Sequence, residues 1–283
     1  MKIKNRLVIL GGGFIASSFK KSLTKNNKNV LLLRKKKIDL FKFDQAKKLI
    51  NIIRKDDMVF VAAALAPVKN QEMYNYNIRI AKNIIKVFKK LKYYKFIYLS
   101  SDAVYSDTLR KITETSKTFP RSLHGQMHLT RERMFKKLTK NNLIIIRPTL
   151  VYGPNDTHNG YGPNKFIREF KKKKIINLFG KGEEKRDHVY IEDLVKILEK
   201  IVFGNYKGIF NIASGKVISF FQIANLIKKS SNKKISLLYN PRKGPIPHKG
   251  YRAFNINKLN KNFKNLNLKR ITSSFIKKLI NNY

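Results

Sequence analysis

The strongest constraint on the fold is an alternation, along the first 150 residues, of short apolar runs with stretches whose apolar residues recur at helical spacing. The apolar runs are rich in valine, isoleucine and leucine and lie at 6–12, 29–34, 57–64, 95–101 and 142–148. The helical stretches between them include 14–25, 44–55 and 77–91. Because strands joined through helices form parallel sheets covered on both faces, the pattern predicts an α/β fold with a doubly wound parallel sheet.

A glycine-rich turn, GGGFIA, separates the first predicted strand from the first predicted helix. Gly11 allows the tight turn, Gly13 lets the backbone approach a pyrophosphate, and Ala16 permits close helix packing. In this position between strand and helix, the turn predicts a dinucleotide site and therefore a sheet of the Rossmann type.

The end of the second predicted strand indicates which dinucleotide is bound. An acidic residue there would bind the ribose 2′-hydroxyl, whereas an arginine can pair with a 2′-phosphate. This chain has Arg34 followed by Lys35, so the expected cofactor is NADP, with NAD as the alternative.

The second half of the chain is less regular. From Tyr152 the sequence becomes rich in glycine, proline and asparagine, as in GPNDTHNGYGPN at 153–164. We therefore expect a dinucleotide-binding Rossmann domain at 1–153 and, at 154–283, mainly a smaller C-terminal substrate-binding lobe. Segments around 187–213 are expected to return to the first domain.

Composition narrows the classes of function. The chain has no cysteine, which excludes a disulfide framework and thiolate chemistry, and no apolar run long enough to span a bilayer. Its net charge is +45, but the lysines are spread along the whole chain, which indicates compositional bias and a solvated basic surface. The expectation is a cytoplasmic protein with no specific nucleic-acid partner; a basic nucleic-acid-associated protein stays open as an alternative.

Three further motifs connect these observations to a known family. SSDAVY at 100–105, RPTLVYGP at 147–154 and RDHVYIEDLV at 186–195 occur in order with the glycine turn, and weaker matches cover nearly the whole chain. With them the chain resembles the extended short-chain dehydrogenase/reductases of the NAD-dependent epimerase/dehydratase family, which act on nucleotide sugars. Through the resemblance we expect an oxidoreductase or isomerase of polysaccharide biosynthesis. Relatives often form homodimers through two helices, here 77–91 and 120–132.

The resemblance also implies the residues of the site. Cofactor contacts are expected from Gly11, Gly12, Gly13, Phe14, Ile15, Arg34, Asp39, Leu40, Ala63, Ala64, Leu65, His128, Pro148 and Val151. Substrate contacts are expected from Ser101, Asp102, Asn164, Arg186 and Arg252. Ser101 corresponds to the residue that binds the reacting sugar hydroxyl or ketone.

The predicted catalytic helix departs from the family pattern. That pattern is P-x-S-x-Y-G-x-x-K-x-x-x-E, and the chain supplies Pro120, Ser122, Gly125 and Glu132 but has His124 and His128 in place of the tyrosine and lysine. A tyrosine with a pKa of about 10 needs a nearby cation to act at neutral pH, whereas a histidine titrates there by itself. The two replacements are therefore consistent as one change: His124 is predicted to be the acid/base, with Ser101 orienting the substrate and His128 bonding the ribose.

Several alternatives remain open at this point. The site could be inactive, leaving a dinucleotide-binding regulator or scaffold; Asp102 or His158 could be the acid instead; and His124, His128 and Glu132 could bind a metal, although none is expected. Dehydratases of the family carry a glutamate directly after the aspartate, where this chain has Ala103, so dehydration is not expected. The predicted function is that of an NAD(P)-dependent nucleotide-sugar epimerase or keto-reductase.

Overall fold

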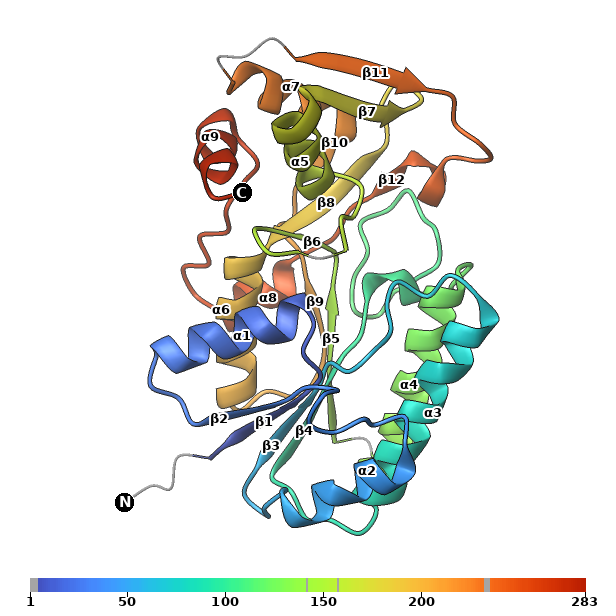
Figure 1. Ribbon diagram of the computed structural model, residues 1–283, viewed down its shortest axis with the longest axis vertical. Coiled ribbons are helices and arrows are strands. Elements are labelled where there is room, and N and C mark those ends of the chain that lie inside the picture. The colour runs from blue at the N-terminus through green and yellow to red at the C-terminus, as the bar shows by residue number, and fades with distance from the viewer. Residues whose placement is uncertain (1–4, 141, 157, 232–234) are drawn as a thin grey trace. The chain divides into compact units, whose positions relative to one another are not determined.

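The computed structural model describes residues 5–140, 142–156, 158–231 and 235–283 (Figure 1). The chain divides into two compact units. The first comprises Met1–Ser106, Lys117–Pro148 and Val195–Phe210, and the second comprises Asp107–Ser116, Thr149–Leu194 and Asn211–Tyr283.

The first unit is built on a six-stranded sheet. Its strands are β1 (Leu7–Leu10), β2 (Val30–Leu33), β3 (Met58–Val61), β4 (Lys95–Leu99), β5 (Leu143–Pro148) and β9 (Gly208–Ile212), in the order β2-β1-β3-β4-β5-β9. Strands β1 to β5 pair in parallel. All residues of β1, β3 and β5 are buried, as expected for strands covered on both faces. This is the doubly wound parallel sheet that the sequence predicts.

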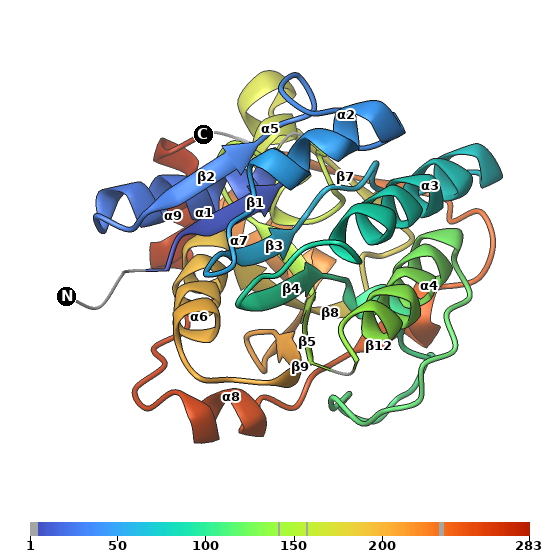
Figure 2. The same cartoon turned by 90° about the horizontal axis from the view of Figure 1, so that it is seen from below.

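Helices cover both faces of this sheet. They are α1 (Phe14–Lys25), α2 (Phe43–Lys47), α3 (Gln71–Phe88), α4 (Leu123–Leu138) and α6 (Ile191–Phe203). Figures 1 and 2 show α3 and α4 side by side on one face, and α1 and α6 on the opposite face. The core on the α3 and α4 side joins apolar residues of the strands to those of both helices.

One predicted helix is shorter than expected. The stretch 44–55 forms only α2 and a 3₁₀ turn, η1 (Lys48–Asn51). Two side chains stop its continuation: Arg6 donates a hydrogen bond of 2.6 Å to the carbonyl of Ile52, and the Asp57 carboxylate accepts one of 2.8 Å from the backbone N–H of Arg54. Both backbone groups are thereby taken from the helical ladder.

The second unit contains two smaller sheets. One joins β6 (Leu150–Tyr152), β8 (Lys185–Tyr190), β10 (Val217–Ser219) and β12 (Tyr251–Arg252), and the other pairs β7 (Ile175–Phe179) with β11 (Ser236–Asn240). Its helices are α5 (Pro163–Lys173), α7 (Phe220–Lys229), α8 (Asn257–Asn262) and α9 (Ser273–Asn281), with a 3₁₀ turn η3 (Pro247–Gly250). Among the described residues, no helix is both long enough and apolar enough to cross a membrane.

Candidate active site

The glycine turn leaves open space at the N-terminus of α1. Gly11 has φ +113°, and a Cβ atom there would lie 2.6 Å from the backbone nitrogen of Ala63, so both conformation and space require glycine. A Cβ on Gly13, by contrast, would meet nothing within 4 Å. Phe14 and Ile15 begin α1, whose first turn carries no acidic residue. The free N–H groups of a helix start beside open space suit a diphosphate.

Arg34 lies directly after β2, on the edge of this turn. Its side chain is exposed and packs over Gly12, where an added Cβ would meet Arg34 Cγ at 2.7 Å. The guanidinium makes one long hydrogen bond of 3.3 Å, to Ser17 Oγ. Lys35 is more firmly engaged, because its Nζ donates a hydrogen bond of 2.9 Å to the Tyr76 hydroxyl, which raises the Lys35 pKa. Arg34 is therefore less firmly engaged than Lys35 and can turn toward a phosphate.

The loops after β2 and β3 are fixed by buried amides. Asn83 Nδ2 donates to the carbonyl of Leu40 at 3.0 Å, while Asp39 accepts the N–H of Phe41 at 3.1 Å. Asn77 binds both the N–H and the carbonyl of Leu65, at 2.8 and 2.9 Å.

The same β3 loop receives a second anchor from α4. Arg131 donates a hydrogen bond of 2.8 Å to the carbonyl of Ala63, which precedes Ala64 in the loop. The predicted cofactor residues Ala63, Ala64 and Leu65 are thus held on both sides. Neither Asn77 nor Arg131 was singled out from the sequence, although Arg131 lies three residues after His128 on the predicted helix.

Ser101 and Asp102 follow β4 at the start of a short 3₁₀ turn, η2 (Asp102–Val104). Ser101 Oγ caps this turn by accepting the N–H of Ala103 at 3.2 Å. Helix α4 packs tightly against η2, since a Cβ on Gly125 would lie 2.1 Å from the Ala103 carbonyl oxygen. Gly125 therefore permits the close approach of the helix that carries both histidines.

His124 and His128 lie one turn apart on α4, which Ser122 caps by accepting the N–H of Gly125 at 3.1 Å. Their rings meet edge to face with centroids 4.7 Å apart. His124 is half-buried, and its Nδ1 accepts a long hydrogen bond of 3.4 Å from the backbone N–H of Val68. His128 is only 5% exposed, and its Nδ1 lies 2.7 Å from the hydroxyl of Tyr98 on β4.

Burial determines the protonation of His128 and Tyr98. It is the main factor that lowers the pKa of His128 well below the ordinary value, and the neighbouring His124 and Arg131 lower it further. Burial also raises the pKa of Tyr98. A neutral imidazole therefore faces a protonated phenol, so the Tyr98 O–H donates to Nδ1 and the ring proton lies on Nε2.

Glu132, one residue after Arg131, belongs to a different buried cluster. Its carboxylate binds Arg147 through two hydrogen bonds, of 2.9 and 2.5 Å, and accepts a third from Ser100 Oγ at 2.5 Å. Glu132 is thus fully engaged and does not complete a metal site with the histidines. In the described part of the chain, no group of three side chains is arranged to hold a metal ion.

The remaining predicted site residues lie at the end of β5 or in the second unit. Pro148 ends β5 and Val151 lies in β6. Asn164 is buried, accepts the N–H of Gly153 at 2.9 Å and donates to Asp156 at 2.6 Å. Arg186 donates to Glu184 at 2.8 Å.

Arg252 belongs to a buried polar cluster of the second unit. Its guanidinium lies 3.1 Å from His248 Nδ1 and 3.7 Å from the Asp107 carboxylate, and only 1% of the residue is exposed. Arg252, like Asn164 and Arg186, therefore already has protein partners.

Two further histidines, His158 and His188, lie in the second unit. His158 is exposed, and its N–H binds Asp156 at 3.0 Å. His188 is buried beside Tyr152 and Phe220, and burial lowers its pKa to about 3. It therefore contributes to packing.

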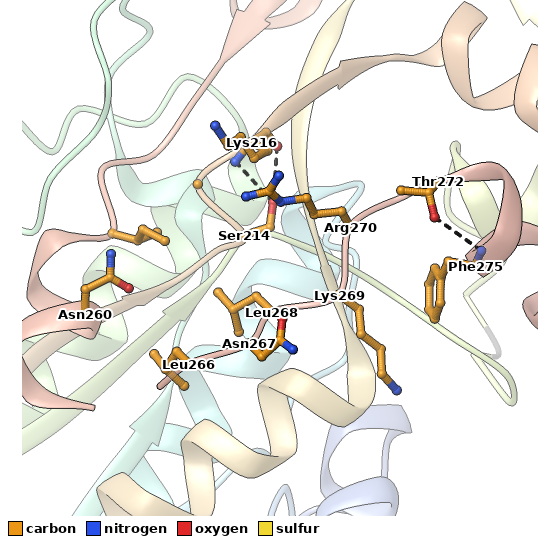
Figure 3. Close-up of a pocket in the computed structure, with 12 residues that line it drawn as sticks. Ser214, Lys216, Asn260, Leu266, Asn267, Leu268, Lys269, Arg270, Thr272 and Phe275 are labelled. Atoms are coloured by element: carbon orange, nitrogen blue, oxygen red, sulfur yellow. Dashed lines mark hydrogen bonds between the residues drawn. The ribbon is translucent and has the colours of Figure 1, made fainter. Parts of the chain in front are cut away.

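The second unit also holds a pocket that the sequence did not predict. Its volume is about 650 Å³, and its lining includes Ser214, Lys216, Leu268, Arg270 and Phe275 (Figure 3). None of the predicted site residues lines it.

Comparison with known proteins decides the family. The profile of the NAD dependent epimerase/dehydratase family matches residues 7–213. The chain belongs to this family. The match includes the glycine turn, both histidines and β9, so the resemblance inferred from the motifs is confirmed.

Individual relatives are distant. The chain is 24% identical over 205 residues to an uncharacterized UDP-glucose epimerase, YtcB, of Bacillus subtilis, covering 69% of this chain and 65% of that protein. It is 27% identical over 272 residues to a dTDP-D-glucose 4,6-dehydratase of Dictyostelium discoideum, covering 80% of this chain and 62% of that protein. The chain thus matches less than two thirds of the length of either relative.

Solved structures confirm the fold. A GDP-L-fucose synthetase of Naegleria fowleri bound to NADP superposes with a TM-score of 0.84 at 16% identity, over 99% of this chain and 92% of the other. At that identity the likeness concerns the fold, which is the Rossmann-type α/β fold predicted from the sequence.

Proposed function

We propose that the chain is an NAD(P)-dependent epimerase or keto-reductase of nucleotide sugars in which His124 is the acid/base. The observation that carries the proposal is the pair His124 and His128 on α4, at the positions of the family's tyrosine and lysine, with only His124 half-exposed. A bound nicotinamide supplies hydride exchange, and the protein supplies binding, orientation and proton transfer.

His124 offers its Nδ1 for proton exchange. Because the Val68 N–H points at Nδ1, the neutral ring carries its proton on Nε2, and Nδ1 is the atom that takes up the next proton. The contact to Val68 is long and therefore weak, so a sugar hydroxyl can replace it. Ser101 would bind the same substrate oxygen, and His128 would donate its Nε2 proton to the ribose.

Dinucleotide binding is supported by the open space at Gly13 and the exposed Arg34. We propose NADP as the preferred form, because Arg34 has only one long hydrogen bond to give up when it pairs with a 2′-phosphate. Substrate binding by Asn164, Arg186 and Arg252, and a homodimer through α3 and α4, remain predictions. One relative is named a dehydratase, so elimination of water is a further possible reaction. We propose that this chain does not catalyse elimination, because Ala103 provides no carboxylate.

The test begins with binding. Purified protein is titrated with NADPH and NADH, alone and with UDP-, GDP-, CDP- and dTDP-sugars. We expect tighter binding of NADPH, a loss of about tenfold in Arg34→Ala with NADPH only, and no change in the control Lys36→Ala, whose lysine is equally exposed. Failure of both dinucleotides to bind would exclude the enzymatic proposal.

Turnover of the sugar nucleotide that tightens binding then tests the acid/base. His124→Phe should abolish turnover while leaving dinucleotide binding intact, and His158→Gln and Asp102→Asn should retain it. Activity that survives in His124→Phe but not in one of the other two would move the acid to that residue. Binding without turnover of any sugar in the wild type would favour the regulatory alternative.

A further inference from the structure

Tyr98 and His128 form a hydrogen-bonded pair that is shielded from solvent. Tyr98 is 1% exposed and His128 5%, and the phenol oxygen lies 2.7 Å from Nδ1. They come from different elements, β4 and α4, so the bond fixes the ring of the helix residue against the central sheet. With one nitrogen taken by the phenol, only Nε2 remains to face a ligand.

Arg131 places a buried positive charge beside this pair. It is completely buried, and its guanidinium lies 5.1 Å from the centre of the Tyr98 ring. It donates to the carbonyl of Ala63, and its Nε has no hydrogen-bond partner among the described residues. Among those residues no carboxylate forms a salt bridge with it, because neighbouring Glu132 is bound to Arg147.

We propose that Tyr98 and Arg131 are positioning residues that hold His128 as a neutral ring with its proton on Nε2, a fixed hydrogen-bond donor in the site. Tyr98 selects the tautomer, because a phenol donating to Nδ1 excludes a proton there. Arg131 adds to the burial of the ring in excluding the second proton, because a guanidinium nearby opposes an imidazolium. The identity of the ligand as a dinucleotide ribose rests on the proposed function; the state of His128 does not.

Among the described residues, the three groups shown to approach His128 favour the neutral state. His124 approaches from the preceding turn of α4, Arg131 from the following turn, and Tyr98 from β4. Glu132, whose charge would stabilise an imidazolium, is neutralised by Arg147. The two histidines thus have different tasks: His128 donates one hydrogen bond at every pH near neutrality, and His124 is the residue proposed to exchange protons.

Nuclear magnetic resonance of the imidazole nitrogens tests this directly. The chain has five histidines, and His128→Gln identifies the signals of His128 by their disappearance. In the wild type we expect a single Nε2–H tautomer whose shifts stay constant from about pH 5.5 to 8, although a free histidine titrates near 6.5. A charged His128 at pH 7, or a proton on Nδ1, would overturn the proposal.

Two substitutions separate the two positioning residues. Tyr98→Phe should give a mixture of His128 tautomers, whereas Tyr93→Phe, a tyrosine of the same core that packs on Phe96, should not. Arg131→Met should make His128 protonate at higher pH than in the wild type, and Arg131→Lys should restore the wild-type behaviour. An unchanged His128 spectrum in Tyr98→Phe would show that Tyr98 does not select the tautomer. An unchanged titration of His128 in Arg131→Met would show that Arg131 does not oppose its protonation.

Binding of NADH gives a functional readout, and NADH is chosen because the 2′-phosphate of NADPH itself titrates at a pH of about 6. The wild-type Kd should be constant between about pH 6 and 8, and Tyr98→Phe should weaken it by about fivefold. A Kd that rises steeply with pH would contradict a neutral donor. Absence of any dinucleotide binding would defeat the proposed function, while the nitrogen spectra would still decide the state of His128.

Discussion

Two buried clusters on α4 differ in how completely their charges are paired. Glu132 accepts three hydrogen bonds and forms an ion pair with Arg147, whereas Arg131, the residue before it, makes one hydrogen bond to oxygen and leaves Nε without a partner among the described residues. Both are at most 4% exposed. Both clusters contain a guanidinium nitrogen without a hydrogen-bond partner among the described residues, Arg131 Nε and Arg147 Nη1, so what separates the clusters is the counter-charge that Glu132 gives to Arg147.

The difference has a physical origin. Burying an ion costs free energy, and the ion pair of Glu132 and Arg147 offsets that cost by placing two opposite charges together. The cluster of Tyr98, His128 and Arg131 has no such internal compensation. Incompletely satisfied buried groups of this kind are common at functional sites, where they perturb the pKa of a neighbour.

The largest expected effect comes from breaking the paired cluster. Glu132→Gln preserves shape but leaves Arg147 buried without its counter-charge, so we expect unfolding free energy to fall by about 3 kcal/mol. Urea denaturation measures it. Asp44→Asn, which breaks an exposed ion pair with Lys47, should change it by less than about 0.5 kcal/mol. Similar losses in both variants would show that the buried ion pair of Glu132 stabilises the fold no more than the exposed ion pair of Asp44.

The second prediction concerns the pH dependence of stability and compares two buried histidines, one in each unit. Burial lowers the folded-state pKa of His128 and of His188, the latter to about 3, below the unfolded value. Their contribution to stability is therefore present above about pH 6.5 and is lost as the pH falls, because the unfolded chain binds protons that the folded one does not.

The measurement is unfolding free energy between about pH 6.5 and 5.5, where few carboxylates take up protons. Each histidine should contribute a slope that approaches about 1.4 kcal/mol per pH unit. His188→Phe and His128→Gln should each flatten the curve by one such increment. A slope insensitive to both substitutions would show that neither ring is neutral in the folded protein.

Much of the first unit was predictable from sequence, because strand and helix periodicities are local signals. The glycine turn and β1 to β5 lie where the apolar runs are. The contraction of 44–55 was not predictable, since it depends on Arg6 and Asp57, which approach from outside the stretch.

The catalytic helix shows the same limit at the level of the site. Its histidines and Glu132 could be found from their spacing. The bond between Tyr98 and His128 could not, because it joins residues thirty positions apart on two elements. The one available signal was a tyrosine next to the apolar residues Phe96 and Ile97 of β4.

Removing the Tyr98 hydroxyl should have a smaller effect on stability than either change above. Tyr98→Phe deletes one buried hydrogen bond and leaves Nδ1 of His128 unsatisfied, so a loss of about 1 kcal/mol is expected in urea unfolding. Tyr152→Phe is the matched control, because that buried hydroxyl has no hydrogen-bond partner among the described residues. Its removal should change stability by less than about 0.5 kcal/mol. Equal losses would mean that ring packing, and not the bond to His128, accounts for the Tyr98 result.

The smallest expected change in unfolding free energy separates the two buried clusters of α4 most clearly. Arg131→Met removes a buried charge that has no counter-ion among the described residues, and the relief of desolvation offsets the lost hydrogen bond to Ala63. Unfolding free energy should therefore stay within about 1 kcal/mol of the wild type, although the neighbouring substitution Glu132→Gln is severe. A loss as large as that of Glu132→Gln would show that Arg131 holds the fold together. Near-neutral stability with altered titration of His128 would show that α4 carries a charge whose effect falls on the site.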